Sequence, residues 1–230
     1  MTYQNETPHD PVQPTVRDRH AVMHGEIRQR ICLLEYPPGM RLSEAALAEE
    51  FGTSRTPIRR VLARLEDEGL VQSHHGVGTI VTDSDIAELA QVYRLRIELT
   101  ELVGRLDPEP PNEKFMLRFD SLVQRSAKVI ATGTPHDFTR FDMEVFQVLL
   151  ELTSNIPLRQ TMERLYFQTK RIWLKTAIEA QLDLDEEVRI FHQELEAIQL
   201  ALRSGDLNAA AHIQRAHISM SFQRLQQQNI

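Results

Sequence analysis

The chain has 230 residues, a length that suits one large domain or two smaller ones. Its hydrophobic fraction of 41% and charged fraction of 26% are typical of a soluble globular protein. No stretch approaches the roughly 18 apolar residues that a membrane-spanning helix needs, so such a helix is excluded. Cys32 is the only cysteine, which excludes an internal disulfide framework and indicates a reducing, cytoplasmic compartment.

The formal net charge of −7 does not by itself favour nucleic-acid binding. Even the N-terminal residues 1–82 hold nine Lys and Arg against eleven Asp and Glu. One segment departs from this balance, because between Ser54 and Leu65 there are four arginines and no acidic residue. Charges farther apart than about 8 Å are screened at physiological salt, so a local basic patch can bind phosphate on an acidic protein.

Residues 1–15 carry three prolines and no apolar cluster, so we predict a disordered arm rather than a signal peptide. Helical spacing of apolar residues then predicts a first helix from Val16 to Leu34, which two prolines end; these residues are Val22, Ile27, Ile31 and Leu34. Ser43 is expected to cap a short second helix, and Gly52 is expected to terminate it.

A third helix is predicted from its capping residue, Ser54, to Gly69. Its apolar face comprises Ile58, Val61, Leu62 and Leu65. After it, residues 70–73 and 79–82 predict two short strands joined through a glycine-containing turn. Three helices followed by a β-hairpin predict a winged helix-turn-helix DNA-binding domain over residues 16–82.

The helical pattern continues from Ser84 to the end of the chain. The predicted helices cover residues 84–106, 113–132, 135–153, 157–180, 184–204 and 206–228. Proline, glycine or a capping residue lies at each break between them. The expected fold is therefore mainly α, with the winged helix-turn-helix followed by an all-helical antiparallel bundle of about six helices over residues 84–228.

The third helix carries side chains suited to reading DNA. Arg55 and Arg59 lie four residues apart and share one face of the helix. The planar fork of arginine can donate two hydrogen bonds to guanine or clamp a phosphate. Ser54 and Thr56 stand at the helix N-terminus, where exposed amides also bind phosphate. A plain solvated arginine face is the alternative, and the surrounding helix, turn and hairpin favour DNA binding.

Many residues of this segment match one family at fixed spacing. They are Pro38-Gly39-Met40-Arg41-Leu42-Ser43-Glu44, Leu47-Ala48-Glu49, Phe51-Gly52-Thr53-Ser54-Arg55-Thr56-Pro57-Ile58-Arg59, Leu62, Leu65-Glu66 and Glu68-Gly69-Leu70-Val71. With them, the segment resembles the winged-helix domain of the GntR family of bacterial transcription regulators. The resemblance implies that Arg55 and Arg59 are the main operator contacts and that Thr56 contacts the DNA backbone. It also implies that His75 and Gly76 lie in the wing.

Two positions depart from that family's pattern. Arg60 stands where the family commonly has Glu, which adds a positive charge to the expected DNA-binding surface. Ala45 stands where some members carry a further DNA-contacting arginine. The operator preference of other members therefore does not carry over to this chain.

The rest of the chain resembles the FadR-type C-terminal domain, often called FCD. The residues that carry this resemblance are Arg94, Ile97-Glu98, Asp142, Asn155, His192, Gly205-Asp206, Ala210 and His217. The resemblance implies an all-helical domain that dimerises and binds an effector. Many members hold a divalent metal through an Asp, a His one turn later and two further His. Their effector, usually a small carboxylate, binds on or near the metal.

By this resemblance Asp142, His192 and His217 match three metal ligands, but Phe146 stands where the neighbouring His is expected. Phenylalanine cannot bind a metal, so two outcomes stay open. Three ligands hold one divalent metal (Zn, Ni or Mn) with an open position, or the pocket takes an organic ligand without metal. Judged without the resemblance, His192 is a core histidine, and Asp142 is either a cap or a local partner of Arg140.

Arg94, Phe146 and Asn155 complete the expected effector site together with the three candidate metal ligands. Arg94 is expected to clamp a carboxylate in the pocket, or alternatively to pair with Glu98 four residues later.

The leading hypothesis is a ligand-responsive transcription regulator that binds an inverted-repeat DNA operator as a homodimer. Its effector would be a small organic acid. A metal-dependent enzyme built on the same Asp and His residues is the rival, but no nucleophile, general base or lid pattern accompanies them. A third hypothesis is an interaction module whose head has lost DNA binding, against which the intact pair Arg55 and Arg59 argues. We therefore expect a regulator without enzymatic activity.

Overall fold

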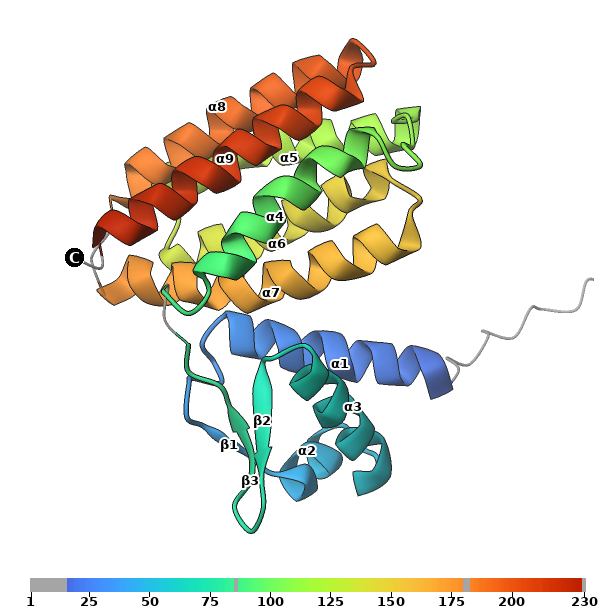
Figure 1. Ribbon diagram of the computed structural model, residues 1–230, viewed down its shortest axis with the longest axis vertical. Helices are drawn as coiled ribbons and strands as arrows, with labels where there is room; N and C mark the ends of the chain where they lie inside the picture. The colour runs from blue at the N-terminus through green and yellow to red at the C-terminus, as the bar shows by residue number, and fades with distance from the viewer. Residues whose placement is uncertain (1–15, 85–86, 180–182, 229–230) are drawn as a thin grey trace, which may run out of the picture.

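The computed structural model describes residues 16–84, 87–179 and 183–228, so the predicted arm of residues 1–15 lies outside the described part. The chain forms two parts in contact (Figure 1). The head consists of helices α1–α3 and strands β1–β3, and the bundle consists of helices α4–α9. The predicted fold class is confirmed: the protein is mainly α, with a small sheet in its N-terminal part. None of the helices in the described part is long and apolar enough to cross a membrane.

The three helices of the head are α1 (Val16–Cys32), α2 (Glu44–Glu50) and α3 (Arg55–Asp67). The side chain of Ser43 caps α2 by accepting a backbone hydrogen bond from its first turn, as predicted. Gly52 has a φ of 59°, a left-handed conformation that lets the chain turn between α2 and α3.

The apolar face of α3 forms the core of the head. Its residues Ile58, Val61, Leu62 and Leu65 are all buried. Helix α3 packs with this face against α1 and α2. The predicted periodicity therefore identifies the buried side of α3 correctly, and the opposite side is left to present its polar residues to solvent.

The strands β1 (Arg41–Leu42), β2 (Val71–His74) and β3 (Gly78–Val81) form an antiparallel sheet in the order β1-β3-β2. The hairpin of β2 and β3 was predicted, but β1 was missed. A strand of two residues shows no alternating pattern, and this one exists through its pairing with β3, where Arg41 lies opposite Ile80.

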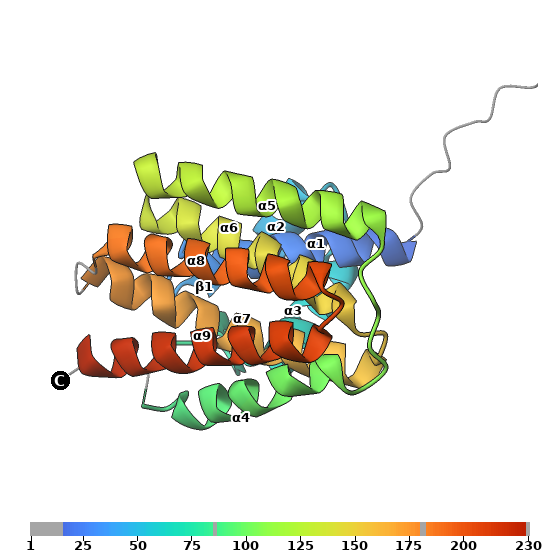
Figure 2. The same ribbon diagram turned by 90° about the horizontal axis from the view of Figure 1, so that it is seen from above.

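In the residues that the structure describes, helices α4–α9 make up the bundle. They are α4 (Ala90–Glu101), α5 (Glu113–Thr132), α6 (Pro135–Leu149), α7 (Ile156–Glu179), α8 (Leu184–Arg203) and α9 (Leu207–Gln228). Neighbouring helices pack in the closed order α4, α7, α6, α5, α8, α9 and back to α4, and α7 also contacts α9. Figure 2 shows the helices side by side. This ring surrounds an interior to which most of the helices contribute side chains.

The first helix of the bundle is shorter than predicted. A helix was expected over residues 84–106, whereas α4 spans Ala90–Glu101 and continues as a 3₁₀ turn over Leu102–Gly104. Leu89 precedes α4 and offers no capping side chain. The apolar periodicity carries no boundary signal there, and residues 85 and 86 lie outside the described part.

Candidate nucleic-acid interface and ligand pocket

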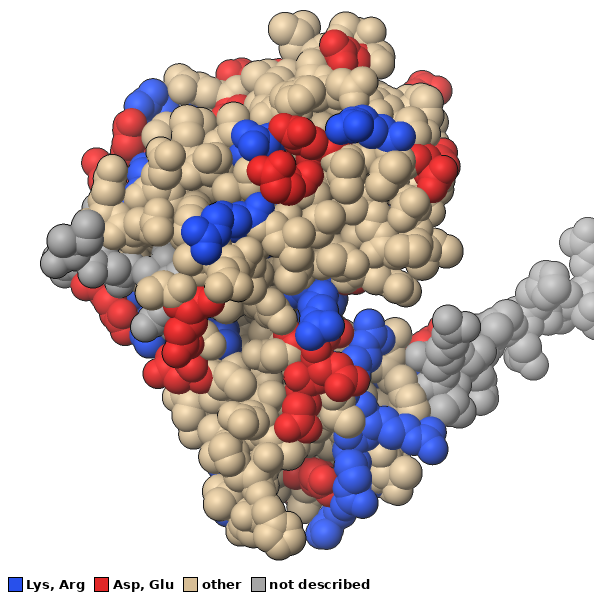
Figure 3. Space-filling model, viewed as in Figure 1, with Lys and Arg blue, Asp and Glu red and all other residues tan. Residues whose placement is uncertain are grey.

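The arginines of α3 lie on its solvent side. Arg55, Arg59 and Arg60 are all exposed, and the side chain of Arg59 is 70% exposed. Arg59 donates two hydrogen bonds, of 3.0 and 2.8 Å, to the carboxylate of Glu44 on α2. These hydrogen bonds lower the pKa of Glu44 and orient the arginine. Figure 3 shows Lys and Arg side chains gathered along one edge of the head.

The N-terminus of α3 is open to solvent. Ser54 has the extended backbone of a capping residue, but its side chain accepts no hydrogen bond from the first turn, contrary to the predicted cap. Thr56 beside it is exposed as well. Amides at a helix N-terminus that lack a capping side chain, together with nearby hydroxyl groups, can bind an anion such as phosphate.

The wing is the turn between β2 and β3. His75 and Gly76 lie at its tip and are exposed, and Gly76 has a φ of 76° that favours glycine. The Glu66 carboxylate of α3 accepts hydrogen bonds of 2.6 and 2.8 Å from the backbone N–H and hydroxyl of Ser73 on β2. The wing is thereby tied to α3, so both are held on the head in a fixed arrangement.

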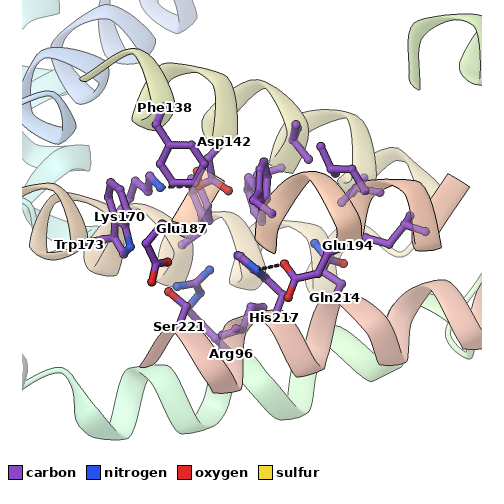
Figure 4. A pocket seen from close by; sticks show the side chains of 18 of the residues that line it. Arg96, Phe138, Asp142, Lys170, Trp173, Glu187, Glu194, Gln214, His217 and Ser221 are labelled. Atoms are coloured by element: carbon purple, nitrogen blue, oxygen red, sulfur yellow. Dashed lines mark hydrogen bonds and ion pairs between the residues drawn. The ribbon is translucent and has the colours of Figure 1, made fainter. Parts of the chain in front are cut away.

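A cavity of about 70 Å³ lies in the bundle, between α4, α6, α7, α8 and α9. Figure 4 shows the side chains that line it. The aromatic ones are Tyr93, Phe138, Phe146, Tyr166, Trp173 and Phe191. The charged and titratable ones, besides the tyrosines, are Arg96, Asp142, Lys170, Glu187, Glu194 and His217. The cavity is thus apolar in most of its wall, with charged groups from several helices converging on it.

Asp142 is held by two groups of α7. Its carboxylate forms a 2.6 Å ion pair with Lys170 Nζ and accepts a 2.7 Å hydrogen bond from the Tyr166 hydroxyl. Burial alone would raise the pKa of Asp142, but the charge of Lys170 and the hydrogen bonds outweigh it, so the pKa is lowered. Asp142 is therefore a carboxylate whose charge is already balanced.

Aromatic rings fix this ion pair in place. Phe146 stacks on Tyr166 with a centroid distance of 3.8 Å and an angle of 3° between the rings. Lys170 Nζ lies 4.7 Å from the ring centroid of Trp173 and 5.4 Å from that of Phe138. These are distances at which a cation is attracted to an aromatic face.

Arg96 reaches the cavity from α4. It donates a 2.5 Å hydrogen bond to the Thr169 hydroxyl, and its guanidinium lies 5.2 Å from the ring of Tyr166 and 5.5 Å from that of Tyr93. Burial lowers the pKa of Arg96. Within residues 16–84, 87–179 and 183–228, no carboxylate forms an ion pair with it.

Glu194 and His217 face each other across α8 and α9 and share a hydrogen bond through His217 Nδ1. The other carboxylate oxygen of Glu194, Oε1, is buried and has no hydrogen-bond partner among the described residues. An unsatisfied buried carboxylate oxygen is costly, so this atom is available to accept a hydrogen bond from a ligand.

Of the predicted effector and metal residues, Asp142, Phe146 and His217 line the cavity, whereas His192 does not. His192 Nδ1 is 2.6 Å from the hydroxyl of Ser126, so the ring faces α5. Successive helix residues are rotated by about 100°, and the cavity side of α8 is formed by neighbours of His192 instead.

Arg94 and Asn155 also lie outside the cavity. Arg94 is exposed, and Glu98, its predicted alternative partner, pairs instead with Arg215 at 3.1 Å. Asn155 caps α7 through its side-chain oxygen and donates a 2.8 Å hydrogen bond to Asp107. Arg94 thus lies on the surface, and Asn155 has a structural role as a helix cap.

The predicted metal ligands do not form a metal site. In the described part of the chain, no group of three or more His, Cys, Asp and Glu side chains is arranged to hold a metal ion. Asp142 is engaged by Lys170, His192 faces Ser126, and His217 is hydrogen-bonded to Glu194. The residues present therefore do not fit the divalent metal that the resemblance implied.

Four charged residues of the cavity were missed from the sequence: Arg96, Lys170, Glu187 and Glu194. Arg96, Lys170 and Glu194 each follow an aromatic residue of the cavity wall by three or four positions, and such positions share a helix face. Lys170, for example, follows Tyr166 by four residues. This spacing is the signal that could have identified them.

Two family models match the chain. Residues 22–81 match the model described as bacterial regulatory proteins of the gntR family, and residues 91–220 match the FCD domain. The solved structure of E. coli McbR/YncC superposes with a TM-score of 0.77 at 19% identity, over 92% of this chain and 99% of that one. At this identity the likeness shows a common fold.

Curated relatives carry the same assignment. The uncharacterized HTH-type transcriptional regulator YdhC of Bacillus subtilis is 26% identical over 141 residues, 61% of this chain and 63% of that protein. An uncharacterized HTH-type transcriptional regulator in an unstable DNA locus of Streptomyces ambofaciens is 45% identical over 85 residues, 37% of this chain and 35% of that protein. The chain thus spans less than two thirds of either relative.

Families and relatives alike are transcription regulators and not enzymes, and the FCD match alone covers more than half of the sequence. The chain therefore belongs to the GntR family of bacterial regulatory proteins, with an FCD domain behind its winged-helix head.

Proposed function

We propose that this protein is a ligand-responsive transcription regulator that binds double-stranded operator DNA as a homodimer. In this proposal the N-terminal half of α3 enters a major groove. Arg55 and Arg59 contact base edges there, and Arg60 adds a phosphate contact. The exposure of all three guanidinium groups on one helix supports this role.

The phosphate contacts near α3 come from Ser54 and Thr56, whose hydroxyl groups lie at an uncapped helix N-terminus. The wing residues His75 and Gly76 approach the adjacent minor groove. A homodimer presents two such heads, so its operator is an inverted repeat with half-sites about 10 base pairs apart, or a multiple of that spacing.

The effector is a small organic acid that binds in the cavity of the bundle. The observation that carries its regulatory role is that α7 is shared by the cavity and the head. Tyr166, Lys170 and Trp173 of α7 line the cavity. On the same helix, Glu163 accepts a hydrogen bond from Arg28 of the head, and Arg171 donates one to Thr82, the residue after β3.

The contact between α1 and α7 is close. Arg28 of α1 forms a 2.9 Å ion pair with Glu163, and its guanidinium lies 3.8 Å from the ring centroid of Phe167. Gln168 donates a 2.8 Å hydrogen bond to the carbonyl oxygen of Glu68, at the end of α3. A ligand that prefers one position of α7 shifts the setting of the head through these contacts, which is the differential binding that allosteric control requires.

The test is to select high-affinity duplexes from random DNA with the full-length chain and to measure their binding by fluorescence anisotropy. We expect an inverted repeat, a dimer on each duplex, and a loss of roughly 1–3 kcal/mol of binding free energy for Arg55→Ala or Arg59→Ala. Arg118→Ala, which removes an exposed arginine of the bundle, is the matched control and should bind as the wild type does.

Unchanged specific binding in both Arg55→Ala and Arg59→Ala would show that α3 is not the reading helix. Selected sequences without two-fold symmetry, bound by a single chain, would contradict the dimeric arrangement.

A further inference from the structure

Asp142, Lys170 and Glu187 of the cavity each have an oppositely charged partner. Asp142 pairs with Lys170, and Glu187 accepts a 2.9 Å hydrogen bond from Arg224. Arg96, by contrast, is a partly buried cation at the cavity wall that forms no ion pair with any described carboxylate. A cation held away from water without an ion-pair partner is unfavourable, so an anionic ligand group at Arg96 would relieve a cost that the protein already bears.

A second unmet requirement lies on another wall of the same cavity. Glu194 Oε1 is buried and finds no hydrogen-bond partner in the described part of the chain, although His217 engages the other oxygen of this carboxylate. A carboxylate oxygen accepts hydrogen bonds and cannot donate them. The ligand that satisfies it must therefore carry a donor, and an ammonium group is the donor that also matches its charge.

At the position expected for a metal, the side chain of Lys170 contacts Asp142. Lys170 Nζ lies 2.6 Å from the Asp142 carboxylate and near the rings of both Phe138 and Trp173. Its ammonium group supplies the positive charge that a divalent ion would bring to Asp142. A ligand can thus bind here without a metal.

The size of the cavity limits the ligand. Its volume of about 70 Å³ is roughly five times the ~10–15 Å³ that one water molecule needs. The wall contacts are aromatic on several sides, so the remaining space suits a ligand of only a few heavy atoms.

We propose that the cavity binds a short α-amino acid without any metal ion, with the ligand carboxylate on Arg96 and its ammonium group on Glu194. A zwitterion carries one charge of each sign. Its carboxylate pairs with Arg96, and its ammonium group donates to the unsatisfied oxygen of Glu194. This inference rests on the proposed function, in which the cavity is the effector site, and it names the chemical class of the effector.

The experiment compares three ligands that share a three-carbon chain: L-alanine, L-lactate and propionate. They carry an ammonium group, a hydroxyl group and a hydrogen atom at the carbon next to the carboxylate. Binding to the full-length chain, dialysed against EDTA, is measured by calorimetry and by the ligand-dependent rise in melting temperature. We expect alanine to bind at least tenfold more tightly than propionate, with lactate between them, and added Zn²⁺ or Ni²⁺ to change none of these affinities.

Two variants and their matched controls test the assigned contacts. Arg96→Met should abolish binding of all three ligands, whereas Arg94→Met, at an exposed position of the same helix, should not. Glu194→Gln should weaken alanine at least tenfold and leave propionate nearly unchanged, whereas the exposed Glu196→Gln should affect neither. Melting of each variant without ligand shows that the variant is folded.

Equal affinity for propionate and alanine would overturn the role of Glu194, and binding that needs added metal would overturn the metal-free site. If propionate binds and alters operator affinity while alanine does not bind, the proposed function stands and the amino-acid inference fails. No binding of alanine to the EDTA-treated protein likewise overturns the inference, whatever the DNA-binding result.

Discussion

The guanidinium of Arg171 on α7 donates hydrogen bonds of 2.5 and 2.7 Å to the carbonyl oxygen and hydroxyl of Thr82, the residue that follows β3. Arg171 is 2% exposed, and burial lowers its pKa. The helix that lines the cavity thus holds the segment by which the chain leaves the head. Movement of α7 would be transmitted to the wing strand next to Thr82.

Arg171→Met keeps most of the buried side-chain volume and removes both hydrogen bonds to Thr82. We expect the free energy of unfolding to fall by about 1–3 kcal/mol, because the carbonyl of Thr82 loses a charged donor. Amide hydrogen exchange in residues 78–84 should become faster, and mass spectrometry of peptides from this segment measures it. Lys175→Met, which removes a more exposed ion pair to Asp83 one turn later, is the control and should change little. Unchanged exchange in Arg171→Met would show that this anchor does not hold the segment.

Glu68 gives the junction of head and bundle a dependence on pH. It lies 2.9 Å from His24 and 3.2 Å from Arg64, with Arg28 at 4.0 Å. Burial alone would raise its pKa, but the hydrogen bond and charge of His24, followed by the two arginines, outweigh burial and lower the pKa below the ordinary 4.5. A carboxyl group whose pKa is lower in the folded protein stabilises it above the unfolded-state pKa, and this contribution is lost as pH falls through the folded-state pKa.

We therefore expect the melting temperature of the wild type to fall as the pH drops below about 4.5, with a smaller fall in Glu68→Gln. At pH 7 the variant should be less stable than the wild type, since the buried His24 loses its carboxylate partner and Arg28 keeps only Glu163. Asp67→Asn, at the exposed neighbouring position, should follow the wild-type curve. Parallel curves for wild type and Glu68→Gln below pH 4.5 would refute this assignment.

The salt dependence of DNA binding tests whether Arg60 contacts a phosphate. Arg60→Gln should weaken binding to all DNA sequences alike and reduce the slope of log K against log salt by about 1. Arg64→Gln is the matched control on the same helix, because Arg64 lies in the last turn of α3 and is engaged by Glu68. A loss confined to one base-pair position of the operator would instead assign Arg60 to base recognition.

Local patterns predicted the head well. The apolar spacing of α3 and the capping of α2 by Ser43 both depend on residues close in sequence, and the structure has them. Val22 shows the limit, since it belongs to the apolar pattern of α1 but is 68% exposed. Periodicity identifies which residues share a face, but the packing of other elements decides which of them become buried.

The cavity was harder to predict for the same reason. Arg94 and Arg96 lie on one helix about 200° apart, and only the position of α7 and α9 beside α4 brings Arg96 inside. Likewise, His192 of α8 faces α5, whereas Glu194 of the same helix faces α9. The resemblance supplied residue types for a metal site, but it could not show that Lys170 of another helix engages Asp142.

Gly104 and Gly25 form a pair of substitutions with opposite expected effects. A Cβ at Gly104 would lie 2.7 Å from Asn208 Oδ1 and 3.0 Å from backbone atoms of Leu207 and Asn208, so α9 must shift to accept it. We expect Gly104→Ala to lower the free energy of unfolding by about 1–3 kcal/mol. At Gly25, inside α1, a Cβ meets nothing within 4 Å, and Gly25→Ala should raise stability by about 0.4–1 kcal/mol. Urea denaturation measures both, and a stabilised Gly104→Ala would contradict the close approach of α9.

Cys32 provides a probe of the contact between head and bundle. The thiol is fully buried, lies 3.7 Å from the carbonyl oxygen of Phe167 on α7, and burial raises its pKa to about 12. Thiolates react with disulfide reagents and thiols do not, so at pH 8 this cysteine should be inert in the folded protein and react once per chain in denaturant.

The rate of that reaction should report how often α1 separates from α7. Arg28→Met removes the ion pair with Glu163 and the cation–aromatic contact with Phe167, so we expect it to accelerate labelling of Cys32 by several-fold or more. Arg30→Met, on the same helix but paired with Glu26 and Glu50 of the head, should not accelerate labelling beyond its effect on global stability. Equal acceleration in both variants at matched stability would mean that labelling follows global unfolding rather than separation of the two parts.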